Sequence, residues 1–295
     1  MTTSIRVFAG WIGLPELRAP GYYRIHGAGT GCTPKEWGSI PYRELRGREM
    51  IGIVLAAGRG SRLDPLTREL PKTLLPIAEG RTILDLILTN LSEIGVQQVA
   101  IVVGHQSDKL ASTRTTFAQR YGLSIELIPN DHIEWNNAYS LLQAQGLFDD
   151  EFILVNGDTL HTPAVERALL EADAPGSVVI AVDFSQTLDI EQMKVVVTDT
   201  RVENISKELH PATSHGEYAG VALFRPAAAD EVVSALEETI KVDPTRYYED
   251  ALQLAITRGL CVTACDIGRG AWIEVDDHQD LESARKTSWP WHESE

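Results

Sequence analysis

The segment that most constrains the fold is a short apolar run that leads into a glycine-rich stretch. Residues 51–55 are Ile, Gly, Ile, Val and Leu, a pattern typical of a strand buried inside a sheet. Ala56, Ala57 and Gly58 follow, and such small residues let a ligand approach the backbone closely. Gly58 and Gly60 allow a tight loop, whose N–H groups are then free to bind an anion. The segment therefore predicts a strand that ends in a phosphate-binding loop.

Positively charged side chains flank this loop. Arg59, Arg62 and Lys72 can pair with phosphate groups, which favours a nucleoside triphosphate as the ligand. The segment does not match a Walker A loop, because no Gly directly precedes Lys72. A dinucleotide-binding fingerprint would need a third Gly at position 63, where this chain has Leu63.

The loop resembles the signature of nucleotidyltransferases that join a nucleoside triphosphate to a phosphorylated small molecule. The matching residues are Leu55, Ala56, Ala57, Gly58, Arg59, Gly60, Ser61, Arg62 and Leu63, followed by Pro71 and Lys72. The resemblance implies that residues 55–61 contact the nucleotide and that Arg62 and Lys72 are catalytic. It also implies a GT-A-like α/β fold, with a Rossmann-like, mostly parallel sheet, helices on both faces and a small antiparallel acceptor-binding lobe.

The order of apolar segments supports the same fold. Apolar residues at helical spacing over 83–94 are followed by predicted strands at 98–103, 123–128 and 152–155. This alternation is typical of a parallel sheet covered on both faces, whose ligands bind at the carboxyl ends of the strands. Further along, the sequence predicts short antiparallel strands at 194–198, 201–206 and 218–224, and a helix over 244–257.

Two aspartates end extended segments near the predicted crevice. Asp158 follows the apolar residues 152–155, where a buried carboxylate would be costly without a cation. Asp276 ends an extended run in which Trp272, Glu274 and Asp276 share one side. In similar enzymes these two aspartates bind a divalent metal, so the resemblance implies Mg²⁺ as the cofactor. Gly157 is expected to contact the nucleotide; the alternative for Asp158 is a structural role in a turn.

A polar segment before a predicted helix at 138–145 points to the nucleotide base. Asn136, Asn137 and Ser140 can cap that helix, and the asparagines can also read a base edge. The form Asn-Asn-Ala-Tyr-Ser is similar to that of cytidylyltransferases that act on phosphocholine and on small phosphonates. The resemblance therefore implies CTP as the nucleotide, with these three residues in its binding site.

Candidates for binding the acceptor come from several segments. Relatives place cations against the acceptor's phosphate near Lys194, which we assign as catalytic, and near Lys207. Aromatic residues among the carboxylates Glu217, Glu249 and Asp250 suit a cationic head group. The acceptor-binding candidates are Trp135, Tyr139, Lys207, Glu217, Tyr218, Tyr248 and Trp272. We expect a small phosphorylated amino alcohol or phosphonate, such as phosphocholine, 2-aminoethylphosphonate or 2-hydroxyethylphosphonate; the alternative for the aromatic residues is a place in the core.

Composition narrows the function further. The formal net charge of −16 argues against general binding to nucleic acid or to an anionic membrane, and no apolar run reaches the length of a membrane span. The three cysteines have neither zinc-site spacing nor a disulfide framework, which favours the cytoplasm. Homo-oligomerisation is left open.

The chain divides into three parts. Residues 1–49 carry seven Lys and Arg against four Asp and Glu, without helical or strand periodicity, and Met50 directly precedes the first predicted strand. We expect residues 1–49 to be a disordered extension or the product of an upstream start site, residues 50–288 to form the nucleotidyltransferase domain, and residues 289–295 to be a tail.

Two other functions remain as alternatives. The first is a sugar-1-phosphate nucleotidyltransferase, which the Asn-Asn-Ala-Tyr-Ser segment disfavours. The second is a non-catalytic nucleotide-sensing module. Such a module would be expected to lack Arg62, Lys72 or one of the two aspartates, and all four residues are present.

Overall fold

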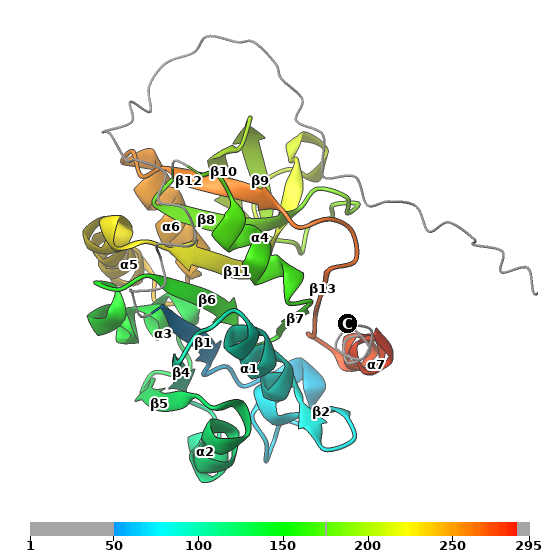
Figure 1. Cartoon of the computed structure of the whole chain (residues 1–295). Coiled ribbons are helices and arrows are strands. Elements are labelled where there is room, and N and C mark those ends of the chain that lie inside the picture. The colour runs from blue at the N-terminus through cyan, green and yellow to red at the C-terminus, as the bar shows by residue number, and fades with distance from the viewer. Residues whose placement is uncertain (1–49, 175, 288–295) are drawn as a thin grey trace, which may run out of the picture. The chain divides into compact units, whose positions relative to one another are not determined.

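The computed structural model describes residues 50–174 and 176–287 (Figure 1). The expectations for residues 1–49 and for the tail lie outside the described residues. The described helices are α1 (Ile83–Glu93), α2 (Ser107–Tyr121), α3 (Asn137–Gln143), α4 (Ala164–Glu171), α5 (Ala229–Val242), α6 (Tyr248–Thr257) and α7 (His278–Thr287). None of these helices is long and apolar enough to cross a membrane.

A nine-stranded mixed sheet forms the centre of the domain, in the order β5-β4-β1-β6-β11-β8-β12-β10-β9. Its strands are β1 (Ile51–Ala56), β4 (Gln98–Val103), β5 (Ser124–Pro129), β6 (Phe152–Asn156), β8 (Val178–Asp183), β9 (Lys194–Thr198), β10 (Arg201–Ser206), β11 (Gly216–Phe224) and β12 (Val262–Asp266). The block β5-β4-β1-β6 is parallel, as is the pair β8 and β12. Strand β11 is antiparallel to both β6 and β8. The parallel block and an antiparallel region confirm the predicted fold class.

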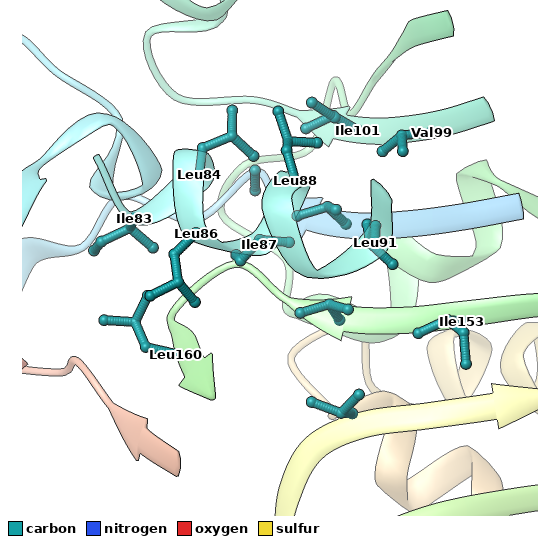
Figure 2. Close-up of a cluster of buried hydrophobic side chains, with 14 of the residues drawn as sticks. Ile83, Leu84, Leu86, Ile87, Leu88, Leu91, Val99, Ile101, Ile153 and Leu160 are labelled. Carbon is teal, nitrogen blue, oxygen red and sulfur yellow. The ribbon is translucent and has the colours of Figure 1, made fainter. Parts of the chain in front are cut away.

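Helices cover both faces of this sheet, because alternate strand residues point to opposite sides. Val54 and Ala56 of β1 belong to one core cluster with α1, α2, α4 and α7, whereas Ile51, Ile53 and Leu55 belong to another with α3, α5 and α6. Figure 2 shows the first cluster, where α1 leucines and isoleucines pack on β4 and β6. Both faces are buried, which explains why the strands read as continuous apolar runs rather than as alternating ones.

Two short pairs of strands lie outside the main sheet. One is β2 (Pro76–Ala78) with β3 (Arg81–Thr82), which leads into α1. The other joins β7 (Thr159–His161) to β13 (Trp272–Glu274) in antiparallel register. The second pair brings two segments more than one hundred residues apart to the same edge of the cavity described below.

Some elements differ from the sequence-based expectations. The helix expected over 244–257 begins only at Tyr248, because Asp250 caps it there by accepting a hydrogen bond from the backbone N–H of Tyr247 at 3.0 Å. Helix α5 was not predicted from the sequence. Strand β9 pairs antiparallel with both β10 and β11, as expected, and all three strands belong to the main sheet instead of forming a second sheet.

Candidate active site

A cavity of about 330 Å³ opens at the carboxyl ends of β1 and β6. It gathers predicted residues from the loop after β1, from the start of α3 and from the β6–β7 turn. Those that line it are Leu55, Ala56, Ala57, Gly58, Gly60, Ser61, Arg62, Lys72, Trp135, Asn136, Asn137, Ser140, Gly157, Asp158, Lys207, Glu217, Tyr218, Trp272 and Asp276. The structure thus brings most of the predicted site together in one place.

The glycine-rich loop presents unbonded backbone donors to this cavity. The N–H groups of residues 58–61 donate no hydrogen bond to another described residue. The loop is held from behind instead: the backbone N–H of His105 donates to the Ala57 carbonyl at 3.1 Å, and the Thr67 hydroxyl donates to the Gly60 carbonyl at 2.8 Å. Gly60 has a φ of +60°, a backbone conformation that residues with a side chain rarely adopt. The arrangement is that of an anion-binding loop.

Three carboxylates and two cations meet beside the loop. Oxygen atoms of Asp158, Glu274 and Asp276 lie within 4.8 Å of one another. The Lys72 Nζ atom lies 3.1 Å from an oxygen of Asp158 and 3.1 Å from an oxygen of Asp276, and an Arg62 nitrogen lies 3.0 Å from the other Asp276 oxygen. Lys72 therefore holds two of the carboxylates together.

The electrostatics of the cluster follow from this crowding. Desolvation by the surrounding cavity wall, together with the negative charges of Asp158 and Asp276, raises the pKa of Glu274 to about 8, although Glu274 is still exposed to solvent. Burial by itself would lower the pKa of Lys72, but the same two aspartates outweigh it, so the pKa of Lys72 is raised. When Glu274 is ionised, the three carboxylates carry more negative charge than Lys72 and Arg62 neutralise.

The donor set fits a divalent cation of the Mg²⁺ type. Mg²⁺ prefers oxygen ligands and is commonly bound by a few carboxylates together with substrate phosphates. Three carboxylates at this separation, one of them with a raised pKa, provide such ligands and gain stability from a nearby positive charge. Asp158, Glu274 and Asp276 are therefore the residues that could hold the metal.

Strand pairing explains why these carboxylates are adjacent. Glu274 pairs with Thr159 in the β7–β13 ladder, and the backbone N–H of Val275 donates to the Asp158 carbonyl at 2.9 Å. Gly157 must be a glycine because a Cβ atom there would lie 2.4 Å from the Leu55 carbonyl oxygen. The close contact of β1 with the β6–β7 turn thus places Asp158 next to the glycine-rich loop.

The asparagines expected to read the base also bond within the protein. The Asn136 amide donates to the Thr245 carbonyl at 3.0 Å, and the Asn137 side-chain oxygen accepts from the backbone N–H of Tyr248 at 2.8 Å. Ser140 accepts a hydrogen bond from Asn130 at 2.9 Å. The two asparagine bonds tie the start of α3 to the start of α6, and the base-reading role stays a prediction.

Four predicted residues do not line the cavity. Arg59 is exposed, and the Tyr139 hydroxyl donates to Asp131 at 2.8 Å. Lys194 is fully buried and its Nζ atom donates to the carbonyls of Ile190 and Gln192 at 3.3 and 2.9 Å. Tyr248 is core, and its hydroxyl bonds to that of Tyr218 at 2.9 Å. For Tyr248, the alternative given in the sequence analysis, a place in the hydrophobic core, is therefore the one found.

The cavity also contains residues that were not among the predicted site residues. These are Thr73, Asn130, Ile133, Asn156, Thr159, Glu191, Met193, Ala219, Gly220, Tyr247, Glu249 and Glu274. Glu274 could have been identified, because it is two residues before Asp276 on the same side of an extended run. Asn156 stands in the same relation to Asp158. Thr73 and Thr159 adjoin predicted residues, and Asn130 and Ile133 follow β5. The remaining residues come from the loop before β9, from β11 and from the start of α6, where Glu249 was named from the sequence as a carboxylate near the aromatic candidates.

The fold and this site define a nucleotidyltransferase. A family profile described as nucleotidyl transferase matches residues 51–288, and the chain belongs to that family. The family predicted from the sequence and the enzyme class are thereby confirmed.

Two curated relatives illustrate the range of the family. The chain is 29% identical over 235 residues to the bifunctional IPC transferase and DIPP synthase of Aquifex aeolicus, covering 79% of this chain and 50% of that protein. It is 32% identical over 241 residues to the CMP-5'-(3-aminopropyl)phosphonate synthase of Streptomyces rubellomurinus, covering 79% of this chain and 38% of that protein. The matched region thus covers no more than half of the length of either relative.

Solved structures share the fold. The inositol-1-phosphate CTP transferase from T. maritima superposes with a TM-score of 0.68 at 25% identity, covering 81% of this chain and 97% of that one. A CTP:phosphocholine cytidylyltransferase from Streptococcus pneumoniae superposes with a TM-score of 0.62 at 20% identity, covering 80% and 98%. At 20% identity, the similarity to the phosphocholine cytidylyltransferase concerns the fold alone.

Proposed function

We propose that the protein is a Mg²⁺-dependent cytidylyltransferase that joins CMP from CTP to a small phosphorylated amino alcohol or phosphonate and releases pyrophosphate. The observation that supports it best is the cluster of Lys72 with Asp158, Glu274 and Asp276 beside unbonded loop amides. Relatives whose names specify CTP or CMP support the choice of nucleotide.

Different residues would bind the triphosphate, hold the metal and stabilise the transition state. The amides of residues 58–61 and Arg62 would bind the triphosphate. Asp158, Glu274 and Asp276 would hold the cation, which supplies charge neutralisation at the reacting phosphates. Lys72 would contact the charge that develops as an acceptor oxygen attacks the α-phosphorus and pyrophosphate leaves. The acceptor oxygen is already ionised, so the transfer needs no general base.

Pyrophosphate release and the mass of the CMP adduct test this function directly. CTP, UTP and dTTP would each be combined with 2-aminoethylphosphonate, phosphoethanolamine, phosphocholine, 2-hydroxyethylphosphonate, inositol 1-phosphate and glucose 1-phosphate. We expect CTP with a small phosphonate or amino-alcohol phosphate to give the highest kcat/KM. If glucose 1-phosphate exceeds all of these acceptors, the protein is a sugar-1-phosphate nucleotidyltransferase.

A matched pair of variants tests the metal-binding carboxylates. Asp276→Asn should lower turnover by about a thousandfold or more, because charge neutralisation dominates this transfer. Asp199→Asn makes the same change in the exposed turn between β9 and β10, where the φ of +54° suits Asn, and should leave turnover unchanged. Near-normal turnover of Asp276→Asn at saturating Mg²⁺ would refute the assignment.

A further inference from the structure

Glu249 has the geometry of a ligand-binding group. It lies in the first turn of α6, lines the cavity and is only 3% exposed. Its Oε2 atom has no hydrogen-bond partner among the described residues. The helix does not need it as a cap, because Asp250 already serves that role. A buried carboxylate oxygen without a donor is costly, so a donor supplied by a ligand would stabilise it.

A second buried carboxylate lines the same cavity. Glu217 of β11 is 6% exposed and accepts one hydrogen bond from Gln192 at 2.7 Å. Asp183, by contrast, has both oxygens bonded, to the backbone and hydroxyl of Ser185 and to the indole N–H of Trp272. Glu217 and Glu249 are therefore the deeply buried carboxylates that remain available to an acceptor.

Acidic residues outnumber basic residues among those that line the cavity. The acidic residues are Asp158, Glu191, Glu217, Glu249, Glu274 and Asp276, and the basic ones are Arg62, Lys72 and Lys207. Arg62 and Lys72 pair with the aspartates of the metal cluster, and the charge of Lys207 does not offset the burial of Glu249. Burial raises the pKa of Glu249 to about 7, and burial with the nearby charge of Asp183 does the same for Glu217.

Three of the aromatic residues that line the cavity already pack against other groups of the protein, which disfavours a cage for a quaternary ammonium group. Trp135 stacks on His132 with 4.1 Å between ring centroids, so one of its faces is already covered. Lys207 lies 4.9 Å from the centroid of the Tyr247 ring, so that face already has a cation. Tyr218 packs against the core residue Tyr248. A trimethylammonium group also has no N–H to donate to Glu249.

We propose that the acceptor carries a primary ammonium group, and that Glu249 together with Glu217 binds it. The ammonium supplies both the missing N–H donor and the missing positive charge, while the phosphate or phosphonate end lies toward the metal cluster. The acceptor class is then an aminoalkyl phosphonate or aminoalkyl phosphate. The inference rests on the proposed cytidylyl transfer and specifies the substrate that this transfer uses.

Selectivity of the unaltered protein provides the first test. With CTP, 2-aminoethylphosphonate or phosphoethanolamine should exceed phosphocholine and 2-hydroxyethylphosphonate in kcat/KM by about 10- to 100-fold, the factor expected for a charged hydrogen bond. The two amines differ only in the phosphonate or phosphate end, so their ratio identifies which source is used. Equal or better use of phosphocholine or of 2-hydroxyethylphosphonate would overturn the inference.

A variant assigns the effect to one side chain. Glu249→Gln keeps the shape and removes the charge, and should reduce the preference for 2-aminoethylphosphonate over 2-hydroxyethylphosphonate to about one, by loss of the amine's advantage. Glu237→Gln makes the same change on the exposed face of α5 and should retain the preference. A Glu249→Gln protein that melts as the parent does and retains the full preference would contradict the assignment.

The outcomes separate this inference from the function on which it rests. CMP transfer to 2-hydroxyethylphosphonate or inositol 1-phosphate at rates above those of the amines would retain cytidylyl transfer and reject the ammonium site. Absence of CMP transfer to every phosphate and phosphonate tried would reject the proposed function itself. If Glu249→Gln fails to fold, the selectivity of the unaltered protein still decides the question.

Discussion

Lys72 is the cation shared by two carboxylates of the metal cluster. Its side chain is 13% exposed, and its Nζ atom lies 3.1 Å from both Asp158 and Asp276. Lys72→Met should lower kcat by about a hundredfold or more, with a smaller effect on KM for CTP, because the charge it contacts develops in the transition state. Steady-state kinetics measure both terms. A change in KM alone would make Lys72 a ground-state clamp.

The same substitution should alter stability in a metal-dependent way. Without Mg²⁺, Lys72→Met leaves the carboxylates without their shared cation, and we expect a loss of about 2 kcal/mol, less than for a fully buried pair. Adding Mg²⁺ should restore most of the Tm, because a cation returns to the carboxylates. Thermal melting in EDTA and in Mg²⁺ measures this difference. An equal loss of Tm in both buffers would mean that Lys72 acts through packing.

The pKa values of Glu217 and Glu249 predict how amine selectivity depends on pH. Both are raised from an ordinary 4.5 to about 7, so both carboxyl groups are mostly protonated below pH 6 and ionised above pH 8. The ratio of kcat/KM for 2-aminoethylphosphonate to that for 2-hydroxyethylphosphonate should therefore rise with pH through about 7, since kcat/KM reports the free enzyme. The charged groups that act on Glu249 are Lys207 and Asp250. Those that act on Glu217 are Asp183, Asp189 and Lys194.

This ratio isolates the two carboxyl groups from the rest of the site. The pKa of Glu274 is raised as well. Glu274 belongs to the metal cluster, which the reaction uses with either acceptor, so the effect of its protonation on kcat/KM cancels in the ratio. A ratio that stays constant between pH 5.5 and 8.5 would contradict the prediction.

The turn between β6 and β7 shows how an element sets the site. At Gly157 a Cβ atom would lie 2.4 Å from the Leu55 carbonyl oxygen and 2.9 Å from a Thr73 methyl carbon. Gly157→Ala should therefore push the turn away from β1, displace Asp158, lower stability by about 2 kcal/mol and lower kcat by about tenfold or more.

A glycine in open space provides the control for this turn. A Cβ atom at Gly146 would meet nothing within 4 Å, so Gly146→Ala should retain both stability and activity. Thermal melting and CMP-transfer kinetics compare the two variants. A Gly157→Ala protein with the Tm and kcat of Gly146→Ala would show that the close contact does not position Asp158.

Elements were predictable where their signal is local. The strand and loop at residues 51–60 follow from an apolar run and from glycines, and the structure has β1 at Ile51–Ala56. Lys194 could not be placed in the same way. A lysine in a short strand reads as exposed, whereas the fold buries it and satisfies its ammonium with two backbone carbonyls. Burial of that kind depends on a loop that closes over the side chain.

For the molecule as a whole, removal of residues 1–49 tests the predicted boundary. Among the residues that the structure describes, those that line the cavity all fall between Leu55 and Asp276. A chain that begins at Met50 should therefore retain kcat, KM and Tm, because it contains the sheet, its helices and all of the described cavity residues. Kinetics and thermal melting of the two chains measure this. A large loss of either activity or stability would show that residues 1–49 contribute to the domain.

The sequence by itself determined the family, the phosphate-binding loop and two of the three carboxylates that could hold a metal, because glycine spacing and strand ends are local features. Only the tertiary structure decided that β11 lies between β6 and β8, and that β13 pairs with β7. These pairings place Glu274 beside Asp158 and bring Glu217 of β11 to the cavity. They are set by burial of apolar faces from distant segments, which no short window of sequence contains.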